Sequence, residues 1–273
     1  MRGVFLGVLA SLLSALTALI VADSGMKGIH PLWLLLAQYL VGMFMSPPRK
    51  LPIHAPIKWH LLRLVAGLWA FGGYYAALAT PGSSPSEMSL VLNIAPVLVI
   101  FFSTSHWKSR LGSVLAFMGV ILVLSKDLAS LSFSHAHLLA LSAAGAYAGS
   151  FLLLARLAQK GETPRAINSF YNFSAGICVL GTILIGQFSL PPIWWPALAV
   201  GCVAALRIQI LTIGSVNPVE SGKIAVLSNL AFVWLALVEC CRGTHYDSQQ
   251  LFAFALVSAG VVLANAPRRD SNA

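Results

Sequence analysis

Long apolar runs alternate with short polar breaks over the whole chain. Most runs approach the roughly 20 residues that a helix needs to cross the hydrocarbon core of a membrane. The breaks are rich in Pro, Gly and charged residues, and they are too short to form a soluble domain. The pattern predicts ten membrane-spanning helices, near residues 3–22, 31–46, 60–79, 85–105, 111–126, 135–157, 166–187, 193–213, 218–240 and 249–266.

The composition supports a membrane protein and excludes a soluble one. Hydrophobic residues make up 58% of the 273 residues, charged residues only 9%, and the mean hydropathy is +0.83. Soluble proteins carry roughly 25% charged residues, and no soluble fold of this length buries so much apolar surface. The first run also fits a signal peptide, but it is long enough to remain as a span. We therefore predict an all-α polytopic membrane protein.

The basic residues indicate the orientation of the helices. The net charge is +9, yet the basic residues form no patch with interleaved aromatic residues, so nucleic acid is not an expected partner. On one side of the spans lie Arg2, Arg49, Lys50, Lys58, Arg63, Lys108, Arg110, Arg156, Lys160, Arg165, Arg268 and Arg269. The other side has Lys27, Lys126 and Arg242. Because basic loops stay in the cytoplasm, we predict a multi-pass protein of the cytoplasmic (inner) membrane with both termini cytoplasmic.

The two halves of the chain resemble each other. Three segments of the first half recur in the same order in the second: LAQYLVG as FYNFSAG, LNIAPVLVI as SNLAFVWLA, and GSVLAFMGVILVLS as FAFALVSAGVVLAN. Halves with five spans each insert in opposite directions, an arrangement found in secondary transporters, whose substrate sites lie near the membrane midplane. The pattern predicts two inverted repeats of five helices, residues 1–130 and 131–273.

The order of these segments resembles a known family. HPLWLLLAQYLVG, YYAALATPGSSPSEMSLVLNIAPVLVIFFS and GSVLAFMGVILVLS resemble one repeat of the drug/metabolite transporter superfamily, in its EamA-type branch, and LLALSAAGAYAGSFLLLARLAQ begins a second. The resemblance covers nearly the whole chain. It implies ten helices around a central cavity, and transport, often export, of small metabolites such as amino acids.

The chain departs from the family pattern at two places. Phe232 stands where the family usually has a second Pro. The linker STSHWKSR lacks the Gly-Glu that often follows the fourth helix, and His245 stands near the corresponding position in the second half. These departures leave the expected fold unchanged, but they weaken any transfer of mechanism from the family.

The segment SSPSEMSLVLNIAPV (83–97) begins like an ordinary helix. Ser84 followed by Pro85 is typical of a helix start, and Glu87 can reach back to the N–H of Ser84 in a capping box. Glu87 is therefore either a helix-start residue or a charged group at the outer mouth of a cavity, where it could titrate.

The same segment continues with polar residues that a lipid-facing helix avoids. Ser86, Ser89, Asn93 and Pro96 fall on one helical stripe, which fits either tight helix packing or a cavity wall. An amide in lipid is costly, so Asn93 must face protein or water. Pro96 removes one backbone hydrogen bond and can expose a carbonyl to the cavity.

The second half offers a matching set of candidates. Asn229 stands opposite Asn93, and the same alignment places Lys223 opposite Glu87. Aligning the helix starts instead places Glu220 opposite Glu87, and Glu220 and Lys223 can pair with each other. Arg207 lies inside a span, where it would bind a substrate carboxylate or phosphate, reach the inner surface, or pair with a glutamate.

Aromatic and amide side chains complete the candidate cavity. Tyr74 and Tyr147 can stack on a substrate, although aromatic residues at helical spacing also fit a packed core. Gln38 stands opposite Asn172 in the repeat, and both can either bond between helices or line the cavity. We count Gln38, Asn172 and Ser89 as secondary candidates.

No motif for catalysis, metal binding or a cofactor stands out. The four cysteines, Cys178, Cys202, Cys240 and Cys241, have no metal-site spacing, and we interpret them as small buried hydrophobic residues. We expect a transporter, as a monomer or homodimer, rather than an enzyme. The alternatives are a lipid-modifying membrane enzyme, for which the acidic residues are too scattered, and a flippase for a lipid-linked substrate.

Overall fold

The computed structural model describes residues 2–47, 54–103, 107–124, 134–216 and 230–264, and every regular element in them is a helix. In the described residues, each predicted apolar run overlaps at least one helix, and the run 85–105 is divided into two. The helices are α1 (Arg2–Met26), α2 (Pro31–Met45), α3 (Ile57–Ala79), α4 (Pro85–Leu92), α5 (Ile94–Ser103), α6 (Trp107–Leu124), α7 (His135–Gln159), α8 (Pro164–Ile185), α9 (Trp195–Val216), α11 (Ala231–Cys241) and α12 (Ser248–Ala264).

The length and surface of the helices are those of a helical membrane protein. Among the described residues, α1, α3, α7, α8 and α9 are long and apolar enough to cross a membrane, and the other helices are apolar but shorter. Large apolar side chains cover much of the outer surface; Phe44 and Ile185, for example, are each 86% exposed. Exposed apolar surface on this scale is typical of a face that contacts lipid or a partner.

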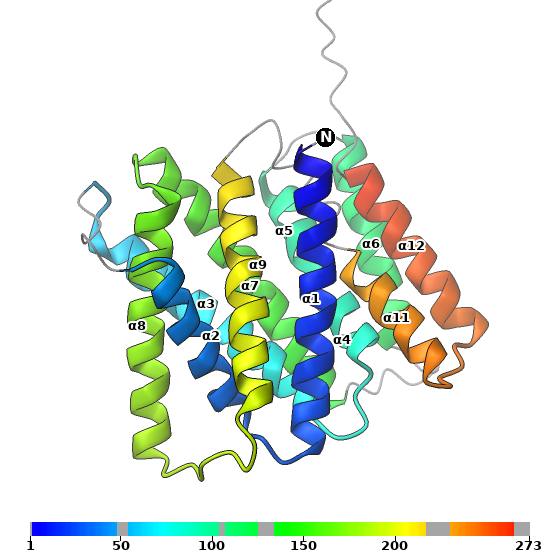
Figure 1. Cartoon of the computed structure of the whole chain (residues 1–273). Coiled ribbons are helices and arrows are strands. Elements are labelled where there is room, and N and C mark those ends of the chain that lie inside the picture. The colour runs from blue at the N-terminus through cyan, green and yellow to red at the C-terminus, as the bar shows by residue number, and fades with distance from the viewer. Residues whose placement is uncertain (1, 48–53, 104–106, 125–133, 217–229, 265–273) are drawn as a thin grey trace, which may run out of the picture.

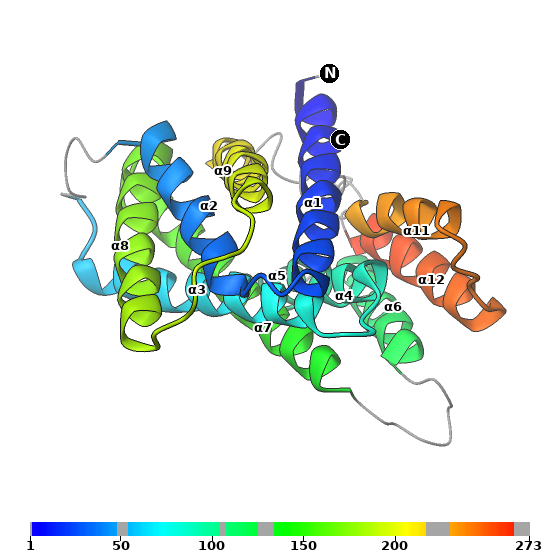
Figure 2. The same ribbon diagram turned by 60° about the horizontal axis from the view of Figure 1, so that its bottom comes forward.

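The helices form a bundle with α1 and α9 side by side at its centre (Figure 1). On one side α2 packs against both α8 and α9, and on the other side α6 packs against α12. The helices α3 and α7 pack against each other and cross beneath the central pair in the turned view (Figure 2). The connection between α7 and α8 and the connection between α11 and α12 lie at opposite ends of the bundle (Figure 1).

Small residues allow a close contact between α6 and α12. A Cβ atom added to Gly260 would lie 2.5 Å from the backbone nitrogen of Ala116, and one added to Gly119 would lie 2.7 Å from Val257. The two backbones therefore approach as closely as they do only because these positions lack side chains.

The prediction that the cysteines are buried is wrong. All four side chains, on α8, α9 and the end of α11, are exposed on the outside of the bundle. Cysteine is apolar enough to face lipid as readily as the core. The hydropathy pattern cannot separate these two environments.

Candidate functional site

A break in the helical path lies at Asn93, between α4 and α5. Asn93 has φ −68° and ψ −3° and ends α4, and α5 begins at the next residue. Pro96 lies in the first turn of α5 and has no N–H to continue the hydrogen bonds of α4. In the second half, Asn229 and Lys223 lie outside the described residues, as does Glu220, so the predicted pairing of the asparagines stays a prediction.

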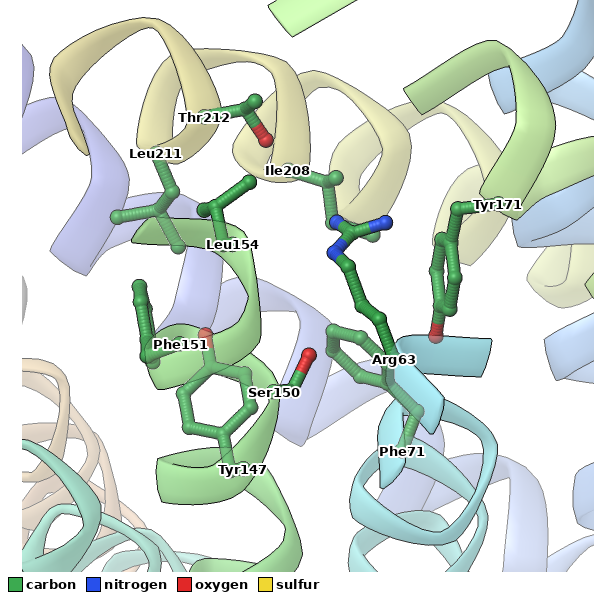
Figure 3. A pocket seen from close by; sticks show the side chains of 10 residues that line it. All are labelled: Arg63, Phe71, Tyr147, Ser150, Phe151, Leu154, Tyr171, Ile208, Leu211 and Thr212. Atoms are coloured by element: carbon green, nitrogen blue, oxygen red, sulfur yellow. The ribbon is translucent and has the colours of Figure 1, made fainter. Parts of the chain in front are cut away.

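A cavity lies between α3, α7, α8 and α9, nearer the end of the bundle at which α7 connects to α8. The cavity volume is about 40 Å³, counted as the space that the centres of water molecules can occupy. This is room for about three waters. Its walls are mainly apolar and aromatic, with a few hydroxyls and one charged group (Figure 3). The lining residues are Arg63, Phe71, Tyr147, Ser150, Phe151, Leu154, Tyr171, Ile208, Leu211 and Thr212.

Arg63 is the charged group of this cavity and was not among the predicted site residues. It lies two turns into α3 and is only 6% exposed, although it was predicted among the basic residues on the cytoplasmic side of the spans. Its guanidinium stacks over the Tyr171 ring at 4.5 Å, and its Nη1 lies 3.5 Å from the Ile167 carbonyl oxygen. Its Nε has no hydrogen-bond partner among the described residues.

A glycine makes room for the stack of Arg63 on Tyr171. A Cβ atom added to Gly67 would lie 2.4 Å from the Tyr171 hydroxyl oxygen. His60, Arg63 and Gly67 are buried on one face of α3, and their spacing of three and four residues is the signal that a helical-face reading would have found.

Arg207, a predicted site residue, is buried beside the same cavity. It is 8% exposed, so it does not reach the inner surface as one alternative required. Its Nη2 donates to the Tyr147 hydroxyl at 3.1 Å, and its Nε has no hydrogen-bond partner in the part of the chain that the structure describes. No described carboxylate forms an ion pair with it. Tyr147 thus connects Arg207 to the cavity that Arg63 lines.

Other predicted residues lie in buried contacts between helices. The Tyr74 and Ser89 hydroxyls are 2.5 Å apart, and the Tyr75 hydroxyl donates to Gln38 Oε1 at 2.5 Å. Asn172 is 2% exposed and packs against Gly42 of α2, where an added Cβ would lie 2.6 Å from its Nδ2. These side chains make contacts between helices. The predicted residues among them, Tyr74, Ser89, Gln38 and Asn172, do not line the Arg63 cavity.

Glu87 lies at a separate pocket at the opposite end of the bundle. The volume of this pocket, counted in the same way as for the Arg63 cavity, is about 300 Å³. It is lined by residues of the turn before α4 and by the start of α7. The Glu87 carboxylate accepts from Gln250 Nε2 at 2.9 Å and lies 3.8 Å from His137 Nε2. The predicted hydrogen bond from Ser84 N–H to Glu87 is therefore replaced by one from α12.

Glu239, which was not among the predicted site residues, accepts hydrogen bonds at the start of α4. It is 6% exposed and accepts from the Ser84 hydroxyl at 3.1 Å, the Ser86 N–H at 3.4 Å, and the Tyr246 hydroxyl. Burial and the bond to Glu239 raise the pKa of Tyr246 well above its usual range. The Ser84 cap of the Glu87 N–H, at 3.3 Å, is formed as predicted.

A second buried carboxylate, Glu162, lies in the connection between α7 and α8. It is 5% exposed and accepts from the N–H groups of His54 at 3.2 Å and Ala55 at 3.0 Å. Its Oε1 is 3.6 Å from His60 Nε2. Glu162 therefore fastens the connection between α7 and α8 to the segment before α3. Groups of His, Cys, Asp and Glu able to hold a metal ion are absent from the described residues.

Comparisons with known proteins bear on the fold alone. No protein family and no curated protein matches the chain. A solved structure described as the crystal structure of a protein aligns with a TM-score of 0.68, at 19% sequence identity, over 96% of this chain and 96% of that one. The chain therefore shares its fold, nearly end to end, with this solved protein.

Proposed function

We propose that the protein is a secondary transporter of a small metabolite, such as an amino acid, in the cytoplasmic membrane. It works by alternating access between two inverted repeats of five helices, residues 1–130 and 131–273. Export is the direction that the family resemblance favours. Both termini then lie in the cytoplasm, on the side of the basic loops.

The packing of the helices supports the inverted repeats. The sequence offset relates α1 to α7, α2 to α8, α3 to α9, α5 to α11, and α6 to α12. Under this relation the contact of α3 with α7 corresponds to the contact of α9 with α1, and α5 with α7 corresponds to α11 with α1; all four contacts are present. The contacts of α2 with α8 and α6 with α12 map onto themselves, as expected around a pseudo-two-fold axis.

The observation that carries the proposal is the polar interior of an otherwise apolar bundle. A buried cation, Arg207, is joined to Tyr147 beside a cavity, and the helix path breaks at Asn93. Polar and charged groups inside the membrane are expensive, and where they occur they mark substrate pathways. Interrupted helices are the elements from which transporters build their sites.

The test is uptake of labelled metabolites, with amino acids first, into vesicles that contain the purified protein. We expect Asn93→Ala and Arg207→Ala to reduce uptake strongly. Arg242→Ala is the matched control, because Arg242 is half exposed and pairs with Asp23 on the surface. Uptake unchanged in both site variants would refute the proposed site, and a wild-type protein that moves none of the metabolites would refute transport.

A further inference from the structure

We infer that the cavity between α3, α7, α8 and α9 binds the carboxylate of a small organic monoanion on Arg63. The inference rests on the proposed function in one respect: the bound anion is the transported substrate. It goes beyond that function because it names the substrate class and the residue that selects it.

The first step is the charge of Arg63. An arginine side chain stays protonated in a protein, and this one is more than nine-tenths buried. None of the three ion pairs formed by described residues includes it. Glu162, in the connection between α7 and α8, lies 3.6 Å from His60 Nε2 and accepts from two backbone N–H groups. A buried charge without a counter-charge is costly, and an anion in the cavity relieves that cost.

The second step is the geometry of the donors. The guanidinium is held in place by its stack on Tyr171, and its Nε has no hydrogen-bond partner among the described residues. A guanidinium presents pairs of N–H groups in a planar fork that matches the two oxygens of a carboxylate. Tyr147, which accepts from Arg207, extends the positive potential to the opposite wall. Arg63 is the single charged residue among the lining residues, so the site suits one negative charge rather than a phosphate dianion.

The third step is the rest of the wall. Phe71, Phe151, Leu154, Ile208 and Leu211 give an apolar lining, to which Ser150 and Thr212 add hydroxyls. Figure 3 shows Arg63 between Tyr171 on one side and the α7 side chains on the other. Such a wall fits a branched aliphatic or aromatic body. The present space holds only about three waters, so the walls must move apart to admit such an anion.

The test is calorimetric titration of the purified, detergent-solubilised protein. The probes are isovalerate, phenylacetate and 3-phenylpropionate, each compared with its own primary amide, which has nearly the same shape without the charge. We expect at least one carboxylate to bind, and its amide to bind at least about tenfold more weakly. This comparison uses only the wild-type protein, so it does not depend on the folding of a variant. Equal affinity for acid and amide, or no binding by any of the three acids, would overturn the inference.

Variants connect the binding to Arg63 and separate the inference from the proposed function. Arg63→Gln should abolish the preference for the acid, and Arg63→Lys should keep part of it because the charge remains. Arg156→Gln is the control, since Arg156 is exposed and lies over Trp59. If Arg63→Gln leaves the vesicle uptake of a solute unchanged, the proposed transport function stands and this site is overturned. If the protein binds the carboxylate but takes up no solute, the site stands and the proposed transport function is overturned.

Discussion

Replacing Glu239 by Ala should destabilise the protein strongly, although the residue lies outside the proposed substrate site. Three donors lose their acceptor: the Ser84 hydroxyl, the Ser86 N–H and the Tyr246 hydroxyl. A hydrogen bond to a charged group contributes about 1.5–3 kcal/mol. The sum is an overestimate, because the Ser86 hydroxyl lies 2.9 Å from both the Ser84 and the Tyr246 hydroxyls and remains their partner. The Ser86 N–H has no such substitute, so we expect a net loss of about 2–4 kcal/mol.

The assay is thermal unfolding of the solubilised protein, followed by tryptophan fluorescence. A loss of this size corresponds to a fall in Tm of about 5–15 °C for a chain of this length. Arg242→Ala is the matched control, because Arg242 lies one turn further along and its ion pair with Asp23 is solvent-exposed, with side chains 52% and 37% exposed. Exposed pairs contribute at most about 1 kcal/mol. If Glu239→Ala lowers Tm no more than Arg242→Ala does, the buried carboxylate does not hold α4 as described.

Three further changes test other parts of the structure. Gly260→Ala should lower the free energy of unfolding by about 1–3 kcal/mol, because its Cβ would lie 2.5 Å from Ala116 N. Gly145→Ala is the control: its Cβ would have nothing within 4 Å, so this change should be neutral or stabilising. Equal Tm values for the two variants would contradict the close contact of α6 and α12. Tyr147→Phe removes the acceptor of Arg207 Nη2 and should lower stability by about 1–3 kcal/mol and weaken carboxylate binding in the titration; wild-type values for both would contradict a role for the hydroxyl. The His30 ring accepts from the Leu32 N–H, and burial lowers its pKa below the usual 6.5; its contribution is complete above pH 6.5 and is lost as the pH falls from 6.5 towards the lowered pKa. The difference in Tm between pH 7.5 and pH 5.5 should therefore be smaller in His30→Asn than in the wild type, and an unchanged difference would exclude His30 as the cause.

Hydropathy predicted the positions of the helices well because membrane-length apolar runs leave few alternatives. The start of α4 was also predictable, since Ser84 and Pro85 act through local backbone geometry. The prediction failed for the partner of the Ser84 N–H: Glu87 binds Gln250 of α12 instead. That contact joins residues far apart in the chain, and a capping motif contains no information about it.

The site was harder to predict than the fold, because burial of a charge depends on how helices pack. Arg207 was visible as a cation inside an apolar run. Arg63 sits near the end of a run, where a basic residue usually marks the membrane surface, and only its packing against Tyr171 and Gly67 places it in a cavity. Glu239 and Glu162 were missed for the same reason: their partners come from distant segments. Asn229 and Lys223 were predicted to contribute to the site, and both lie outside the described residues.

Under the proposed transport function, the two buried carboxylates have a consequence for the timing of transport. Glu239 holds the start of α4 at one end of the bundle, and Glu162 holds Ala55 before α3 at the other; each crosses from one predicted half to the other. Because both sets of bonds are made at once, the two predicted halves are fastened to each other at both ends of the bundle in this conformation. In the alternating-access cycle proposed above, a solute would pass only when the bonds at one end break while those at the other end hold. The relative strength of the two sets of bonds would then decide which end opens first, and the weaker set would decide how long the protein stays shut between turnovers.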